Sequence, residues 1–190
     1  MVKLYQIICI YERYLNKLFG LLCSFGIIVL GVDNMSKTLV AYFSCSGVTR
    51  KLAEDLCGVV NGDLYEIKPV NPYTDEDLDW TNNESRSSVE MNDKSYRPEI
   101  INDLENIDEY DVVYLGFPIW WYQAPTIINT FLEKYDFTGK KIIPFATSGS
   151  SGMGETNKYL ADSCKGAILV EGKRFNKPTV EELTNWVNSL

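Results

Sequence analysis

Short strand-like segments alternate with helix-like segments along most of this chain, and this alternation constrains the fold more than any other feature. Residues 37–44, 111–118, 141–146 and 167–170 are dominated by apolar, β-forming residues, while residues 63–70 alternate between apolar and polar. Strands that are apolar along their length and alternate with helices indicate a parallel sheet covered on both faces. The sequence therefore predicts an α/β domain of three layers (α/β/α), in which a doubly wound sheet of five parallel strands lies between helices.

The helical segments follow individual strands and differ in how clearly they are marked. In the first, apolar side chains recur every three or four residues from Val48 to Val59, which places them on one face of a helix. The last begins at Thr179, with Glu182 three residues further on, which is the spacing of a capping box. The predicted helices occupy residues 47–60, 125–135, 153–162 and 179–190.

Composition excludes several classes of function. The chain has 190 residues and a net charge of −8, and because phosphate backbones would repel it we expect no nucleic-acid partner. It contains no histidine, which excludes catalytic triads and metal sites that depend on an imidazole. Its five cysteines are at least twelve residues apart, so the sequence predicts neither a zinc site nor a disulfide framework. A reducing compartment, the cytoplasm, is the expected location.

The first 34 residues differ from the rest of the chain. They carry a net charge of +1, against −9 for residues 35–190, and include a 15-residue apolar segment from Leu18 to Val32. That segment is shorter than the roughly 20 residues of a membrane span but suits the apolar region of a signal peptide. Three interpretations stay open: a start site assigned upstream of a native start at Met35, a signal peptide for export, or a membrane anchor. We therefore divide the chain into an N-terminal extension, residues 1–34, and a globular domain, residues 35–190, that contacts a membrane only if residues 18–32 are retained.

The turn after the first predicted strand carries the most specific signal. It reads Ser44-Cys45-Ser46-Gly47-Val48-Thr49 and is followed directly by a helix. The free N–H groups and the positive dipole end of a helix N-terminus attract anions, the hydroxyls add donors, and a glycine lets the backbone approach closely. The turn therefore suits a phosphate monoester, although a Ser46 that serves only as the N-cap of the helix would explain part of the pattern.

Three other phosphate-binding motifs do not fit. No glycine begins a G-x-x-x-x-G-K-[ST] loop, and the run Gly152-Met153-Gly154-Glu155-Thr156-Asn157 lacks the third glycine of a dinucleotide fingerprint. The loop of cysteine phosphatases needs an arginine six residues after its cysteine. After Cys45 the arginine comes one residue too early, at Arg50, and Lys51 cannot supply the bidentate fork.

These residues resemble the flavodoxin-like family. The S/T-x-S/T-G-x-T turn at residues 44–49 is similar to the FMN-phosphate loop of that family, and the resemblance extends over residues 37–190. It implies FMN as the cofactor and a sheet with the strand order 2-1-3-4-5. In that order the loops after strands one, three and four meet at one crevice, and these loops contain Pro118–Pro125 and Thr147–Gly154.

Each of the three loops has a role that the resemblance implies. The aromatic residues Trp120, Trp121 and Tyr122 offer flat surfaces on which the isoalloxazine ring can stack. Because adjacent residues at a strand end point to opposite sides, we expect one of the two tryptophans to face the crevice. The Gly/Ser-rich third loop offers backbone N–H groups to the polar edge of the ring. No catalytic residue and no metal ligand is predicted, and the predicted FMN-binding residues are Ser44, Cys45, Ser46, Gly47, Val48, Thr49, Pro118, Ile119, Trp120, Trp121, Ser148, Gly149, Ser150 and Gly152.

The resemblance implies a flavodoxin-type electron carrier. Stacked aromatic side chains and the acidic domain both oppose added negative charge on the flavin, which favours a low redox potential. One loop departs from the family pattern, because flavodoxins commonly have a glycine after strand three that stabilises one-electron-reduced flavin. This sequence has Ile119-Trp120-Trp121-Tyr122 there. The alternative is therefore an FMN-dependent NAD(P)H oxidoreductase of the same fold that reduces a quinone or a similar acceptor. A third hypothesis is a flavin-free binding protein.

Residues 71–111 are strongly acidic. They hold 13 acidic residues against three basic ones, a net charge of −10. We interpret this stretch as a solvated surface segment, and the second interpretation is a docking patch for a basic partner. For an electron carrier the partners would be redox proteins, a reductase and an acceptor, that dock on the acidic surface. For an oxidoreductase, residues 71–99 would serve as a lid or contact the nicotinamide.

Overall fold

The computed structural model describes residues 37–101 and 104–190. The interpretations of residues 1–34 therefore concern a part of the chain outside the described residues. Within residues 37–101 and 104–190, no helix has both the length and the apolar character that crossing a membrane requires.

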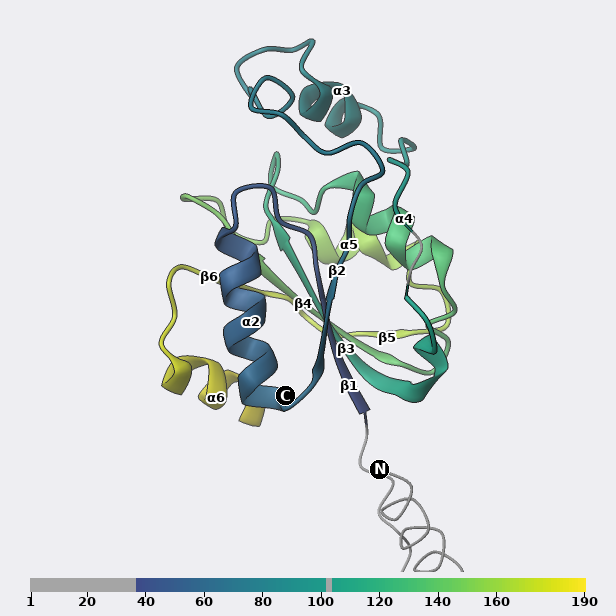
Figure 1. Cartoon of the computed structure of the whole chain (residues 1–190), viewed down its shortest axis with the longest axis vertical. Helices are drawn as coiled ribbons and strands as arrows, with labels where there is room; N and C mark the ends of the chain where they lie inside the picture. The colour runs from purple at the N-terminus through teal and green to yellow at the C-terminus, as the bar shows by residue number, and fades with distance from the viewer. Residues whose placement is uncertain (1–36, 102–103) are drawn as a thin grey trace, which may run out of the picture. The chain divides into compact units, whose positions relative to one another are not determined.

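A parallel sheet forms the centre of the domain. Its strands appear in the order β2-β1-β3-β4-β5, and every neighbouring pair of strands runs parallel (Figure 1). This confirms the predicted order 2-1-3-4-5 and the doubly wound α/β class. The strands are β1 (Lys37–Tyr42), β2 (Asp63–Glu66), β3 (Tyr110–Pro118), β4 (Lys141–Thr147), β5 (Ile168–Leu169) and β6 (Lys173–Phe175).

The strand after β4 differs from the prediction. The sequence predicts one strand at residues 167–170, but two short strands occupy this edge of the sheet. β5 pairs with the start of β4, and β6 pairs with its end, from Phe145 to Thr147. Val170, Glu171 and Gly172 lie between them and belong to neither strand. The prediction ended at Val170 because the charged residues that follow hide the second half of the strand, of which only Phe175 is buried.

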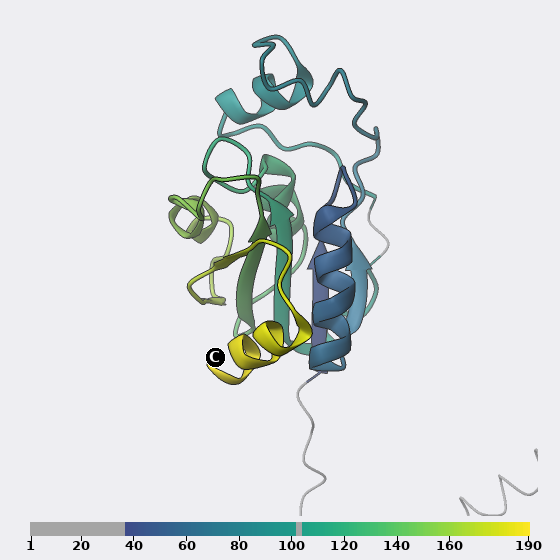
Figure 2. The ribbon, with the colours of Figure 1, turned by 90° about the vertical axis from the view of Figure 1, so that its left-hand side faces the viewer.

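Helices cover both faces of the sheet. α2 (Val48–Val60) and α6 (Val180–Asn188) lie on one face, while α4 (Thr126–Lys134) and α5 (Thr156–Ala161) lie on the other (Figures 1 and 2). The two faces have separate cores. One contains Leu52, Leu56, Phe145 and Trp186, and the other is built around Phe117, Ile127 and Phe131. The predicted capping box at the start of α6 is present, with both Thr179–Glu182 bonds formed.

The connection from β2 to β3 contains a long insertion, residues 70–99, which we call the excursion. Its two ends are joined by a β-bridge between Pro69 and Ile100 and by backbone hydrogen bonds from Val70 to Glu99 and from Ile101 to Lys68. It carries the short helix α3 (Arg86–Asn92), and a 3₁₀ turn, η2 (Ile107–Glu109), precedes β3. Figures 1 and 2 show the excursion above the carboxyl ends of the strands.

The excursion is more than a solvated surface segment. Ser85, Ser87, Ser88, Glu90 and Met91 are buried in it. Its acidic residues are nevertheless largely exposed, as the sequence predicts, and Trp80 is 74% exposed among them. The excursion thus has an outer acidic surface and an inner side packed on the domain.

Candidate functional site

A cavity of about 880 Å³ opens at the carboxyl edge of the sheet. Its walls come from the turn after β1, from α2 and from the segments that follow β3, β4 and β6. This is the crevice at which the strand order reverses, where open α/β sheets bind ligands. The lining residues are Ser46, Gly47, Val48, Lys51, Leu52, Asp55, Pro118, Ile119, Trp120, Thr147, Ser148, Gly149, Phe175, Asn176, Lys177 and Pro178.

The turn after β1 presents the N-terminus of α2 to this cavity. Gly47 is the N-cap residue, with a φ of 81° that only glycine adopts without strain, and its N–H donates to Ser44 Oγ at 3.1 Å. No side chain caps the helix and no acidic residue lies in its first turn. Ser46, Gly47 and Val48 all line the cavity. The first N–H groups and the positive dipole end of α2 are therefore available to an anion there.

Three residues of this turn do not line the cavity: Ser44, Cys45 and Thr49. Thr49 is buried, and its hydroxyl lies 2.8 Å from the hydroxyl of Thr147 at the end of β4. Cys45 is exposed as a residue, yet surrounding protein atoms keep water from its thiol and raise its pKa to about 12. The thiol therefore stays protonated at neutral pH, which makes it a poor nucleophile.

The segment after β3 supplies an aromatic wall. Trp120 lines the cavity, and its ring meets those of Phe43 and Tyr73 edge to face, with centroids 5.7 and 5.4 Å apart. Trp121 does not line the cavity and is 42% exposed. The two tryptophans therefore differ in environment, as expected of adjacent residues at a strand end.

Trp121 and Tyr122 occupy a tight turn in a strained conformation. Trp120 and Gln123 exchange two backbone hydrogen bonds of 3.0 Å, and the two residues between them have φ values of 46° and 62°. Positive φ at both central positions defines a type I′ turn, which favours glycine or asparagine. The backbone of this loop thus takes the conformation for which a glycine would be expected, although the sequence has none there.

The third loop follows β4. Ser148 and Gly149 line the cavity, whereas Ser150 and Gly152 do not. The Ser148 hydroxyl donates to the carbonyl of Ser151, which closes the loop on itself. A Cβ atom at Gly154, whose φ is 55°, would lie 2.2 Å from the carbonyl oxygen of Tyr122. The second and third loops therefore meet at backbone contact.

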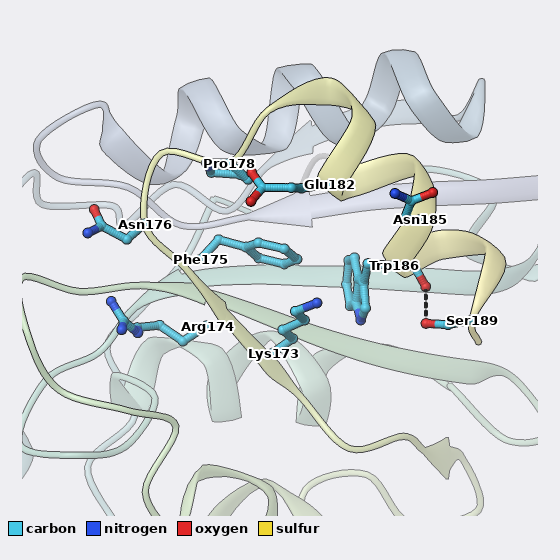
Figure 3. A pocket seen from close by; sticks show the side chains of 9 residues that line it. All are labelled: Lys173, Arg174, Phe175, Asn176, Pro178, Glu182, Asn185, Trp186 and Ser189. Atoms are coloured by element: carbon cyan, nitrogen blue, oxygen red, sulfur yellow. Dashed lines mark hydrogen bonds between the residues drawn. The ribbon is translucent and has the colours of Figure 1, made fainter.

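Sequence reasoning missed the fourth wall of the cavity, residues 175–178. They comprise Phe175, the last residue of β6, and the segment after it, and β6 is the strand that the sequence does not predict. The ring of Phe175 meets that of Trp186 in α6 edge to face at 5.0 Å, and Figure 3 shows these two rings facing each other. Phe175 and Pro178 also line a second pocket of about 440 Å³ on the α6 side. Residues 175–178 thus lie between the cavity and this second pocket. The signal available in the sequence was the Phe-Asn-Lys-Pro run directly before the predicted helix at residues 179–190.

The missed residues also include a charged group on α2. Lys51 and Asp55, one helical turn apart, form an ion pair beside the cavity. Lys177 lies on the opposite wall with a φ of 50°. Within the described residues, no group of histidine, cysteine, aspartate or glutamate side chains is arranged to hold a metal ion.

The parallel sheet of order 2-1-3-4-5, with a cavity at its carboxyl edge, defines the flavodoxin-like class of α/β proteins. The chain belongs to the flavodoxin family, whose sequence model, described as Flavodoxin, matches residues 37–190.

Solved structures similar to this chain include two flavoproteins. A Bacteroides eggerthii protein described as a flavoprotein is 49% identical, with a TM-score of 0.78 over 81% of this chain and 97% of that one. A flavoprotein from Lactobacillus acidophilus, crystallised in complex with FMN, is 24% identical, with a TM-score of 0.60 over 73% and 93% of the two chains. The similarity to the Lactobacillus acidophilus protein shows a shared fold and nothing further.

Two curated proteins also align, the Rattus norvegicus and Homo sapiens forms of BAR/IMD domain-containing adapter protein 2-like 1. The rat protein is 29% identical over 136 residues, which covers 59% of this chain. This chain spans about a quarter of the length of these curated relatives, 26% and 27%. The match contributes nothing to the functional argument.

Proposed function

We propose that this chain binds FMN in the cavity at the carboxyl edge and transfers electrons as a flavodoxin-type flavoprotein. One observation carries the proposal: the N-terminus of α2, Trp120 and the Ser148–Gly149 segment all line the same cavity. A mononucleotide needs an anion site, a flat apolar surface and backbone donors within one ligand length, and these three elements supply them in that order. The FMN complex of the Lactobacillus acidophilus flavoprotein, a protein of the same fold, is consistent with this assignment.

Different residues of this chain would bind the phosphate, the face and the polar edge of FMN. The N–H groups around Ser46–Val48 would hold the phosphate, and Trp120 would keep water from one face of the ring. The backbone N–H groups of Ser148 and Gly149 would serve its polar edge. When bound, FMN supplies the redox chemistry. The protein therefore needs to bind and orient the flavin and to set its redox potential, and it does not need to move protons.

Charge supports a carrier with a low redox potential. The domain has a net charge of −9 over residues 35–190, and its field opposes the negative charge that reduction places on the flavin. Exposed carboxylates of the excursion, with the exposed Trp80 between them, would dock a redox partner with a basic surface. Such docking is transient and weakens as salt is added.

Binding of FMN to the purified full chain tests the cofactor assignment. We expect one FMN per chain, with quenching of flavin fluorescence, and at least tenfold weaker binding of riboflavin, which lacks the phosphate. Gly47→Val should weaken FMN binding strongly, because valine is strained at a φ of 81° and the turn that presents the N-terminus of α2 would have to change its conformation. Gly58→Val, in the last turn of α2, is the control for the substitution itself. A protein that takes up no FMN would refute the proposal and leave a flavin-free binding protein.

A second candidate is an FMN-dependent NAD(P)H oxidoreductase of the same fold. The observation that favours it is the extent of the cavity, which reaches beyond the three predicted loops to Asp55 and to residues 175–178. That part of the cavity would take a second molecule, such as a quinone. Stopped-flow mixing of the FMN-loaded protein with NADPH or NADH separates the two functions. Rapid direct reduction supports the oxidoreductase, and reduction only after a reductase is added supports the carrier.

A further inference from the structure

Tyr73, in the excursion, contacts the aromatic wall of the cavity from behind. Its ring lies edge to face with Trp120 at 5.4 Å and with Phe43 at 5.7 Å, while Phe43 and Trp120 are themselves 5.7 Å apart. The three rings thus form a closed triangle in which only Trp120 reaches the cavity. Edge-to-face packing of this kind has defined geometry, so the ring of Tyr73 restricts the orientation of Trp120.

A buried ion pair fixes Tyr73 in turn. Glu90 is 1% exposed and accepts hydrogen bonds from the hydroxyl of Tyr73 and, at 2.7 Å, from Nε of Arg86. The Arg86 guanidinium carbon lies 3.9 Å from the centre of the Tyr73 ring, and its Nη1 donates to the carbonyl of Asn71 at 2.7 Å. A charged group as deeply buried as Glu90 is tolerated only when it is paired and hydrogen-bonded.

The excursion therefore reaches the proposed flavin site at its aromatic wall, through the contact between Tyr73 and Trp120.

We propose that Tyr73 is a positioning residue for the flavin site, held by the Arg86–Glu90 ion pair so that its ring sets the orientation of Trp120. This inference rests on the proposed function and deepens it. The excursion then serves as a structural brace of the cofactor site as well as an outer acidic surface. Loss of the Tyr73 ring should change the environment of the bound flavin without removing any group that contacts it.

Three variants of the full chain test the proposal. Tyr73→Leu removes the ring, Tyr73→Phe removes only the hydroxyl, and Tyr96→Leu makes the same change at a 40% exposed position in the excursion. We expect Tyr73→Leu to raise the FMN dissociation constant at least fivefold, to alter the visible circular dichroism of bound FMN and to shift its midpoint potential. Tyr96→Leu should stay within twofold of the parent affinity and keep its spectrum, and Tyr73→Phe, which keeps the ring and its contact with Arg86 but loses the bond to Glu90, should change affinity and spectrum less than Tyr73→Leu. An unchanged affinity, spectrum and potential in Tyr73→Leu would overturn the proposal.

A measurement on the flavin-free protein separates this inference from FMN binding itself. The chain has four tryptophans, so fluorine NMR of fluorotryptophan-labelled protein gives four resonances, and Trp120→Phe identifies the one from Trp120. Tyr73→Leu should shift that resonance, while Tyr96→Leu should not. A shift in a protein that binds no FMN would support the packing role and refute the proposed function. An unmoved resonance would refute the positioning role. If Tyr73→Leu does not fold, Tyr73→Met, which keeps most of the volume without a ring, takes its place.

Discussion

The hydroxyl oxygens of Thr49 and Thr147 lie 2.8 Å apart, and both residues are buried. One belongs to the first turn of α2 and the other to the last residue of β4, 98 positions away in the sequence. This single bond therefore joins two of the elements that form the cofactor cavity. The sequence analysis predicts Thr49 as an FMN-binding residue, whereas in the structure its hydroxyl bonds to Thr147.

Replacing both threonines by valine should destabilise the domain by less than the sum of the two single replacements. Thr49→Val or Thr147→Val leaves one buried hydroxyl without its partner, which costs about 1–3 kcal/mol of unfolding free energy. In the double variant no polar group is left unsatisfied, so its loss should be smaller than the sum of the two. Urea unfolding of the flavin-free parent, the two single variants and the double variant measures the coupling energy between the two threonines. Strictly additive losses would show that the bond contributes nothing.

Gly154→Ala should disrupt the contact between the second and third loops. The new Cβ would meet the Tyr122 carbonyl oxygen at 2.2 Å, and alanine is strained at a φ of 55°. We expect a loss of about 2 kcal/mol in stability together with weaker FMN binding, measured by urea unfolding and by flavin fluorescence. Gly152→Ala is the matched control in the same loop, since nothing lies within 4 Å of its added Cβ. Equal behaviour of the two variants would contradict the prediction.

Tyr122→Asn should stabilise the protein. Tyr122 is 67% exposed and has a φ of 62°, a conformation that asparagine adopts more readily than tyrosine. Relief of this strain should raise the melting temperature, and the free energy of unfolding should increase by about 0.5–1 kcal/mol. Tyr96→Asn replaces an exposed tyrosine whose φ is not positive, and it should bring no such gain. A lower melting temperature for Tyr122→Asn would count against strain in this turn.

The ion pair between Arg97 and Glu133 should make stability depend on pH in acid. Arg97 donates two hydrogen bonds of 2.8 Å to this carboxylate, and these bonds, followed by one from Ser163, hold the pKa of Glu133 below its ordinary 4.5. A carboxyl whose pKa is depressed on folding stabilises the protein above its unfolded pKa, and the contribution is lost as pH falls through the folded value.

Glu133→Gln should therefore lower stability at pH 7 and reduce its decline below pH 4.5. Because both side chains are partly exposed, solvent screening limits the effect to about 0.5 kcal/mol. Urea midpoints from about pH 3 to pH 7 measure it. Glu84→Gln is the control, since Glu84 is exposed and forms no ion pair among the described residues. A pH profile identical to that of the parent protein would contradict the prediction.

The sequence predicted the parts of the fold that depend on local patterns. Apolar strands and the Thr179–Glu182 capping box are recognisable from neighbouring residues, and their positions agree with the structure within a few residues. β6 was missed because Lys173 and Arg174 give it no apolar pattern, and its position is set by pairing with β4. The cavity wall formed by residues 175–178 was missed for the same reason, because it begins at the end of β6.

Long-range packing explains why the excursion was misjudged. Its many acidic residues indicate a solvated segment, and nothing local shows that Glu90 is buried between Arg86 and Tyr73. The triangle of Phe43, Tyr73 and Trp120 joins three distant parts of the chain. For the same reason, the sequence could not indicate which hydroxyls of the turn after β1 face the cavity.

The broken strand at one edge of the sheet bears on how the protein behaves at high concentration. An uninterrupted edge strand is a template on which another molecule can extend the sheet, and proteins that expose one are prone to aggregate. Here β5 and β6 have two and three residues, separated by Val170, Glu171 and Gly172, and β2 at the opposite edge has only four. Neither edge offers a ladder long enough for a stable intermolecular strand, so the described sheet should not extend by strand addition between molecules.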